Sequence, residues 1–127
     1  MISASDFKIS IENQKGSYKS FGIENDPVWS SYPLQGVTYP VDYGYIQGYT
    51  GEDGAELDVF VGTGNLQGCI RVWRLDVPVE TKFFIETSES ELKEIKKAFL
   101  PVLRDVEILD DEGFNAHVET FKSVTAD

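Results

Sequence analysis

The sequence holds few sulfur-containing, imidazole and basic side chains, and each shortage excludes a class of protein. A single cysteine, Cys69, cannot form a disulfide within the chain, which fits a reducing, cytoplasmic environment. The single histidine, His117, is interpreted as a surface or packing residue, and no Ser–His–Asp arrangement is found. Eleven basic residues against 22 acidic ones give a net charge of −11, which argues against a nucleic-acid partner.

The chain also has no apolar run of the length that a membrane span requires. Its first residues do not combine a basic segment with an apolar one, so we expect no secretion signal and no membrane partner. With 127 residues and 41% hydrophobic content, the chain is predicted to fold as one globular domain over residues 1–127.

Alternation of apolar and polar residues predicts a series of short strands. Residues 7–12 place Phe7, Ile9 and Ile11 on one face and are expected to form a half-buried strand. Similar patterns predict further strands at residues 69–75, 81–85 and 102–109. Turn-forming residues predict turns at 25–27, 32–33 and 110–113.

One helix is expected late in the chain. Ser88 and Glu91 have the spacing of a capping box, Leu92 and Ile95 recur at helical spacing, and Pro101 ends the pattern. A short helix is one interpretation of residues 114–124. The fold class is therefore mainly β (α+β): a small closed or partly open, five-stranded OB-like β-barrel with one or two helices packed outside.

The most distinctive stretch of the sequence spans residues 39–61. It packs four tyrosines and five carboxylates between two strand-like segments, with glycines at the turns. Asp53 lies in the loop of this stretch, and Asp58 opens the apolar run that follows. Carboxylates gathered at the mouth of a sheet repel one another unless a cation or a basic partner joins them.

A second acidic group follows at a proline turn, where Asp76 and Glu80 lie four residues apart and just before Lys82. Mg²⁺ prefers one or two carboxylates together with waters and phosphate oxygens, and a lysine among them would serve as a point charge for phosphate. The alternative is that these are ordinary turn aspartates, which hydrogen-bond their own backbone. Spacing alone leaves both interpretations open.

The whole set of motifs resembles the soluble inorganic pyrophosphatases of the Mg-dependent β-barrel type. Residues 39–46, Y-P-V-D-Y-G-Y-I, and 53–59, D-G-A-E-L-D-V, are similar to that family's Y-P-x-N-Y-G-[FY]-I and D-G-D-P-x-D-V segments. Residues 76–82 are similar to its D-x₄-D-x-K segment, with one residue deleted and Glu in place of the second Asp. The similarity extends over about residues 11–107, which makes the chain a shortened and divergent member.

The resemblance implies Mg²⁺-dependent attack of water on inorganic pyrophosphate, or on a related phosphoanhydride, to give two phosphates. It assigns the metal-binding role to five acidic residues: Asp53, Asp58, Asp76, Glu80 and Glu12. It assigns phosphate binding to Lys19, Lys82, Arg104 and the hydroxyl of Tyr43. The catalytic group would be Tyr43, Asp53 and Asp58. By the same resemblance a homo-oligomer is expected.

Two departures from the family pattern favour an alternative function. Ala55 stands where the family has an aspartate that takes a proton from the attacking water, and a methyl group cannot do this. Glu56 or Glu52 is a candidate replacement. Ser31 stands where the family has an arginine. The alternative is a non-catalytic module that keeps the metal- and phosphate-binding site without hydrolysis, and a further option is a purely structural or partner-binding barrel.

Overall fold

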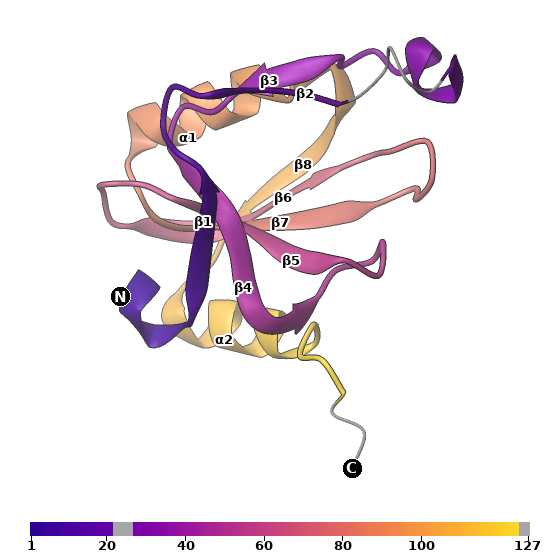
Figure 1. Ribbon diagram of the computed structural model, residues 1–127. Helices are drawn as coiled ribbons and strands as arrows, with labels where there is room; N and C mark the ends of the chain where they lie inside the picture. Colours follow the sequence, from indigo (N-terminus) through magenta and orange to yellow (C-terminus); the bar gives the residue numbers. More distant parts are fainter. Residues whose placement is uncertain (22–26, 125–127) are drawn as a thin grey trace.

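The computed structural model describes residues 1–21 and 27–124, and its centre is a six-stranded mixed sheet. In spatial order the strands are β1 (Ile9–Asn13), β4 (Asp42–Thr50), β5 (Glu56–Val61), β7 (Glu80–Thr87), β6 (Leu66–Val72) and β8 (Leu103–Ile108). Only β5 and β7 pair in parallel, and the other pairs are antiparallel. The strands fan out through a strong twist (Figure 1).

The remaining elements cover the two faces of this sheet (Figure 1). On one face lie α1 (Glu89–Ala98) and the two-stranded ribbon of β2 (Tyr18–Ser20) and β3 (Gly36–Thr38). On the other face lies α2 (Asp111–Glu119). The described residues also form three short 3₁₀ helices: η1 (Ala4–Asp6), η3 (Pro27–Ser31) and η4 (Leu100–Val102). No helix in the described residues is long and apolar enough to cross a membrane.

The central strands β4, β5, β6 and β7 each supply apolar side chains to two separate cores, because successive residues point to opposite faces of the sheet. Phe60 and Phe84 belong to the core beneath α1, whereas their neighbours Val59 and Phe83 belong to the core above α2. The central strands are therefore apolar on both faces, which explains their continuous hydrophobic runs. A polar side chain on the α1 face needs a specific partner, and this is where the predicted site residues lie.

The sequence correctly predicted a mainly β fold with one or two helices, of which the described residues form two, and the details differ in three ways. The five-stranded OB-like barrel is not confirmed, because the described residues form a six-stranded sheet whose edge strands, β1 and β8, do not pair. The half-buried strand expected at residues 7–12 is β1, which runs from Ile9 to Asn13. Its Ile11 is 42% exposed because β1 is an edge strand. The predicted turn at 110–113 is wrong: Asp110 caps α2, its carboxylate accepting a bond from Gly113 N.

Other local expectations agree with the structure. Ser88 caps α1, and the reciprocal bond from Ser88 N to Glu91 completes the capping box at 2.8 Å. The strand expected at 102–109 is β8. The turn expected at 25–27 lies largely outside the described residues.

Gly44, in the middle of the tyrosine-rich stretch, has a structural role that predicts a stability change. A Cβ added there would lie 1.8 Å from the carbonyl oxygen of Ser10 on the neighbouring β1. Gly44→Ala therefore has to push β1 away from β4, and we expect it to lower the free energy of unfolding by about 2 kcal/mol or more in urea titrations. At Gly51 the nearest atom would be 3.4 Å away, so Gly51→Ala is the control. Equal stability of the two variants would contradict this packing.

Candidate functional site

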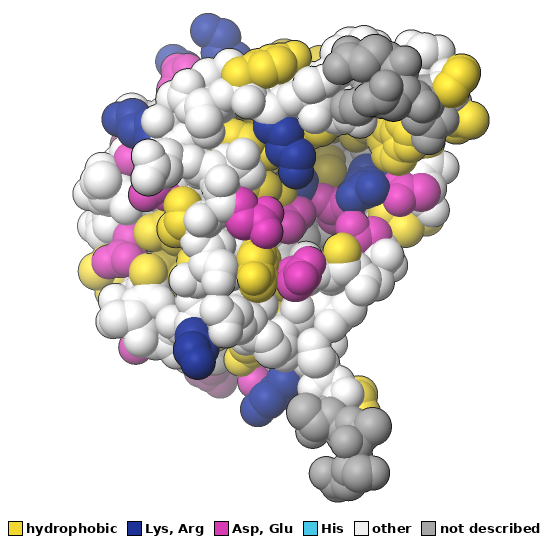
Figure 2. Space-filling model, in the orientation of Figure 1, with side chains coloured by type: hydrophobic (Ala, Val, Ile, Leu, Met, Phe, Trp, Pro, Cys, Tyr) yellow, Lys and Arg dark blue, Asp and Glu magenta, His cyan; other side chains and the backbone are white. Residues whose placement is uncertain are grey.

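Seven of the nine predicted site residues meet in a cavity of about 600 Å³ on the α1 face of the sheet. Its walls come from β2, from η3 and from the strands β1, β4, β5, β6 and β7, together with the segments that connect them. Figure 2 shows acidic side chains gathered around this hollow, with basic and hydrophobic side chains beside them. The aromatic residues that line it are Phe21, Trp29, Tyr32, Tyr39, Tyr43 and Phe99. We call it the acidic pocket.

Strand pairing places the three central polar side chains of the acidic pocket. Asp58 on β5 shares its face with Phe60, and Lys82 on the adjacent β7 shares its face with Phe84. Tyr43 on β4 is paired with Phe60 in the β4–β5 register. Asp58, Lys82 and Tyr43 therefore approach from three neighbouring strands, although they lie far apart in the sequence.

Lys82 is the centre of this group and is 7% exposed. Its Nζ donates to Tyr43 Oη at 2.7 Å and to Asp58 Oδ2 at 2.8 Å, and lies 2.5 Å from Glu80 Oε1. Burial alone would lower the pKa of Lys82, but Asp58, Tyr43 and Glu80 outweigh it and raise that pKa well above its usual value. Burial raises the pKa of Tyr43, so its phenol stays neutral. The lysine is a fixed positive charge at the floor of the pocket.

A second cation, Arg74, enters the acidic pocket from the β6–β7 connection. Its Nη1 lies 3.0 Å from Asp53 Oδ2 and 2.5 Å from Glu80 Oε2. Its Nε and Nη2 bind the two oxygens of Asp76 at 2.8 and 2.9 Å. Burial opposes the charge, but the bonds to Glu80 and Asp76 raise the pKa of Arg74. The sequence argument missed this residue. The only signal for it was an arginine two positions before the predicted Asp76.

Glu80 joins the two cations, because one of its oxygens faces Lys82 and the other Arg74. The side chain is 3% exposed. Burial alone would raise the pKa of Glu80, but the charges and hydrogen bonds of Lys82 and Arg74 outweigh it, so the pKa is lowered. A buried carboxylate between two cations is destabilised when either cation is removed without a replacement.

Not every residue named from the sequence lines the acidic pocket. Asp53, Asp58, Glu80, Lys82, Tyr43, Glu12 and Lys19 do. Asp76 is absent from the walls and reaches the site through Arg74. Arg104 is also absent from the walls: it is exposed, and its Nε donates to the carbonyl oxygen of Pro78 at 2.8 Å. Among the described residues, neither Glu12 nor Lys19 has an ion pair within 4.0 Å.

The structure separates the two candidate replacements for the base missing at Ala55. Glu52 binds Thr81, accepting from the backbone N–H at 2.9 Å and from the hydroxyl at 2.7 Å, so it anchors the start of β7. Glu56 is exposed and lies on the pocket wall, two residues before Asp58 on the same face of β5. No hydrogen bond or ion pair to a described residue holds its carboxylate. Glu56, and not Glu52, is therefore free to face a ligand.

The chemistry of the acidic pocket fits a divalent cation. Among its described lining residues, five carboxylates (Glu12, Asp53, Glu56, Asp58 and Glu80) face three cations (Lys19, Arg74 and Lys82), leaving a formal excess of two negative charges. Carboxylate oxygens are the ligands that Mg²⁺ prefers. Within residues 1–21 and 27–124, no three acidic, histidine or cysteine side chains are already gathered around one point. Arg74 and Lys82 hold the oxygens of three of the five carboxylates.

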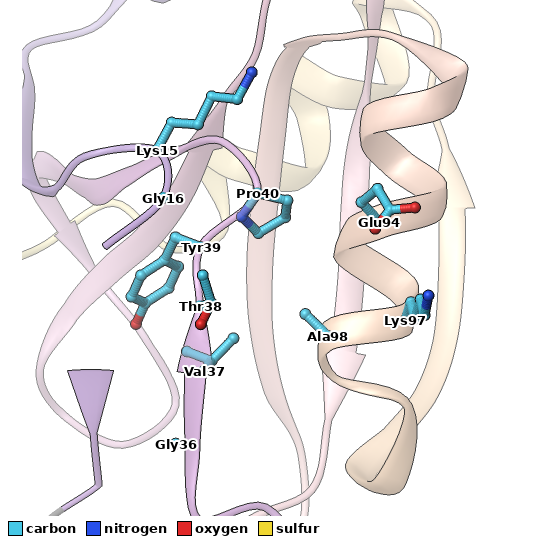
Figure 3. A pocket seen from close by; sticks show the side chains of 10 residues that line it. All are labelled: Lys15, Gly16, Gly36, Val37, Thr38, Tyr39, Pro40, Glu94, Lys97 and Ala98. Atoms are coloured by element: carbon cyan, nitrogen blue, oxygen red, sulfur yellow. The ribbon is translucent and has the colours of Figure 1, made fainter. Parts of the chain in front are cut away.

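A second hollow lies between α1 and residues 36–40 (Figure 3). Tyr39 is the one residue that lines both this hollow and the acidic pocket. The charged side chains of the second hollow are Lys15, Glu94 and Lys97. The ring of Tyr39 points away from the helix and stacks on Tyr43 with a centroid distance of 4.5 Å. The two hollows therefore share a wall, and the candidate chemistry lies in the acidic pocket.

Comparisons with known proteins add a family match. The family model described as inorganic pyrophosphatase matches residues 1–94 of the chain. This range includes every residue that lines the acidic pocket except Phe99, and it ends before Arg104. The search of curated proteins gave no match.

The position of Glu80 predicts a pH-dependent stability change. Because Glu80→Gln leaves Lys82 and Arg74 partly uncompensated, we expect it to lower the free energy of unfolding at pH 7 by about 3 kcal/mol. A lowered pKa means that the charge stabilises the fold above the unfolded value of about 4.3, and that this contribution is lost as the pH falls through the folded pKa. Urea titrations at neutral and acidic pH should show the gap between variant and wild type closing in acid.

Exposed Glu119, 3.6 Å from Lys122, supplies the matched control for this experiment. Glu119→Gln removes the same charge and should change stability by less than about 0.5 kcal/mol at either pH. A Glu80→Gln protein as stable as this control at pH 7 would contradict the arrangement.

Proposed function

The chain belongs to the inorganic pyrophosphatase family, and from this premise we propose that its acidic pocket hydrolyses inorganic pyrophosphate or a closely related phosphoanhydride. A water oxygen bonds to one phosphorus while the bridging P–O bond breaks, so that two phosphates leave. The observation that carries this proposal is the bonded group of Tyr43, Asp58 and Lys82 at the floor of a pocket walled by further carboxylates. A donor, a carboxylate and a fixed cation at one point suit phosphoryl chemistry.

The acidic residues of the pocket would hold Mg²⁺. Glu56 and Asp58 offer carboxylates from the same face of β5, with Asp53, Glu80 and Glu12 on the surrounding walls. A bound Mg²⁺ would lower the pKa of a coordinated water and neutralise phosphate oxygens. Asp76 contributes through its hold on Arg74.

The basic residues of the pocket would bind the two phosphate groups. Lys19 on β2 lines the cavity and has no ion pair with a described residue, and Lys82 lies at the floor of the cavity with the hydroxyl of Tyr43 beside it. Both lysines are point charges suited to phosphate oxygens. Arg104, which lies outside the cavity walls, is left out of this proposal.

Glu56 would take the proton from the attacking water in place of the aspartate that Ala55 replaces. Its carboxylate is exposed, borders the cavity and is adjacent to Ala55 in the sequence. A general base must come within hydrogen-bond reach of the proton that it takes, and a carboxylate on the cavity wall is placed for this. Glu52 is unsuited, because both of its oxygens are bound to Thr81.

The second candidate function is a non-catalytic module that binds metal and phosphate. Two observations favour it: the methyl group of Ala55 at the cavity wall, and the engagement of Asp53 and Glu80 with Arg74. This candidate predicts binding of pyrophosphate in calorimetric titrations without release of phosphate.

Phosphate release from pyrophosphate in the presence of Mg²⁺ tests the proposed hydrolysis. We expect wild-type turnover and a loss of about 10²-fold or more in Glu56→Gln, since a positioned general base contributes about 10²–10⁴-fold. Asp58→Asn should lose activity to a similar or greater extent because it removes a metal-binding carboxylate and the partner of Lys82. Glu94→Gln, in the second hollow, is the matched control and should keep wild-type activity.

The remaining outcomes separate the two candidates. Release of phosphate by Ala55→Asp alone would show a binding module that has lost its base. If wild type and Ala55→Asp both leave pyrophosphate and related phosphoanhydrides intact, hydrolysis is wrong. Thermal unfolding measurements on each variant show whether an inactive protein is still folded.

A further inference from the structure

Arg74 occupies the position at which a cation would meet the acidic pocket's carboxylates. Its Nη1 contacts Asp53 Oδ2 at 3.0 Å and Glu80 Oε2 at 2.5 Å. The other oxygens of these carboxylates are also taken, since Asp53 Oδ1 accepts from Ala55 N at 3.0 Å and Glu80 Oε1 faces Lys82. A divalent cation can bind Asp53 and Glu80 only by displacing one of these partners.

Of these partners, Arg74 is the one that a cation can displace from the two carboxylates. Lys82 is 7% exposed and lies at the floor of the pocket, held by Tyr43 and Asp58 as well. The Arg74 side chain is 29% exposed and comes from the connection between β6 and β7. Asp76, itself 48% exposed, holds the other edge of the guanidinium. Arg74 can therefore release Asp53 and Glu80 without losing its second anchor.

Once Arg74 is released from the carboxylates, its guanidinium is also placed to bind an anion. Arg74 borders the same cavity as Lys19 and Lys82. Its planar fork suits phosphate oxygens, which it can bind through two N–H groups. While it is bound to Asp53 and Glu80, its charge is neutralised and adds little attraction for an anion.

We propose that Arg74 is a built-in counter-ion that a divalent cation displaces from Asp53 and Glu80, so that its guanidinium turns, still anchored by Asp76, toward the anionic ligand. The cation and the arginine compete for the same oxygens, and the arginine then replaces part of the phosphate-binding charge that Ser31 does not supply. This inference rests on the acidic pocket being the site of the proposed function, but not on turnover.

Trp29 provides a reporter for this movement. The guanidinium carbon of Arg74 lies 5.5 Å from the centroid of the Trp29 ring. The chain has two tryptophans, and Trp73 contacts Tyr32 at a centroid distance of 5.1 Å. In a Trp73→Phe protein, fluorescence reports Trp29 alone, and we expect it to change as Mg²⁺ is added. The change should be absent when Arg74→Gln is introduced into the same protein.

Calorimetric titration of Mg²⁺ into the full chain, without any phosphate ligand, measures the competition directly. Two nearby unit charges interact by several kcal/mol at a partly exposed site, so we expect Arg74→Gln to bind Mg²⁺ at least about tenfold more tightly than wild type. Arg71→Gln is the matched control. It removes the same charge from a guanidinium that pairs with Asp105 and Glu107, outside the acidic pocket, and should bind as wild type does.

Four outcomes decide the proposal. Tighter binding in Arg74→Gln but not in Arg71→Gln supports it, as does binding seen only in Arg74→Gln. Unchanged or weaker binding in Arg74→Gln overturns it, and so does the absence of binding in all three proteins. None of these results depends on phosphate release, so the counter-ion role and the proposed hydrolysis can fail separately.

Discussion

The structure depends on one buried carboxylate that two cations share. Glu80 lies at the start of β7 between Lys82 and Arg74, and through them it is linked to Asp58, Tyr43, Asp53 and Asp76. Charges at 3% and 7% exposure are costly unless each finds its partner. The network therefore fixes how β4, β5 and β7 face the pocket, and it places acidic and basic side chains next to one another.

The sequence predicted those features that depend on neighbouring residues. The capping box of α1 and the strand β8 follow from local patterns, and the tyrosine-rich motif led to the right family. The extent of the sheet could not be predicted, because alternation identifies strands but not the pairs they form. The cap at Asp110 was missed because an acidic turn and a helix N-terminus have the same composition.

The same limit applies to the candidate site. Asp53, Asp58, Glu80 and Lys82 could be named from spacing and resemblance, and the structure brings them together in one cavity. Arg74 could not be named from the sequence, because its place in the pocket depends on how the β6–β7 connection folds. For the same reason spacing could not choose between Glu52 and Glu56. Tertiary contacts occupy the first carboxylate and leave the second free.

For each of the departures from the family pattern at Ala55 and Ser31, the acidic pocket has another side chain that could compensate for it. Ala55 removes one acidic side chain, Glu56 adds another nearby on β5, and Arg74 brings a guanidinium to a pocket in which Ser31 supplies none. Under the proposed function, the acidic pocket supplies acidic and basic groups for metal-assisted phosphoryl transfer, with Glu56 as the base and Arg74 as the arginine.

The most direct test of the central claim is an X-ray structure of the protein crystallised with Mn²⁺ and phosphate, in which anomalous scattering locates the metal. The account predicts Mn²⁺ bound by carboxylates of the acidic pocket, Asp58 and Glu56 among them, and a phosphate near Lys19 and Lys82. It also predicts Arg74 turned away from Asp53 and Glu80. An acidic pocket without Mn²⁺ and phosphate, with Arg74 still bound to both carboxylates, would contradict the account.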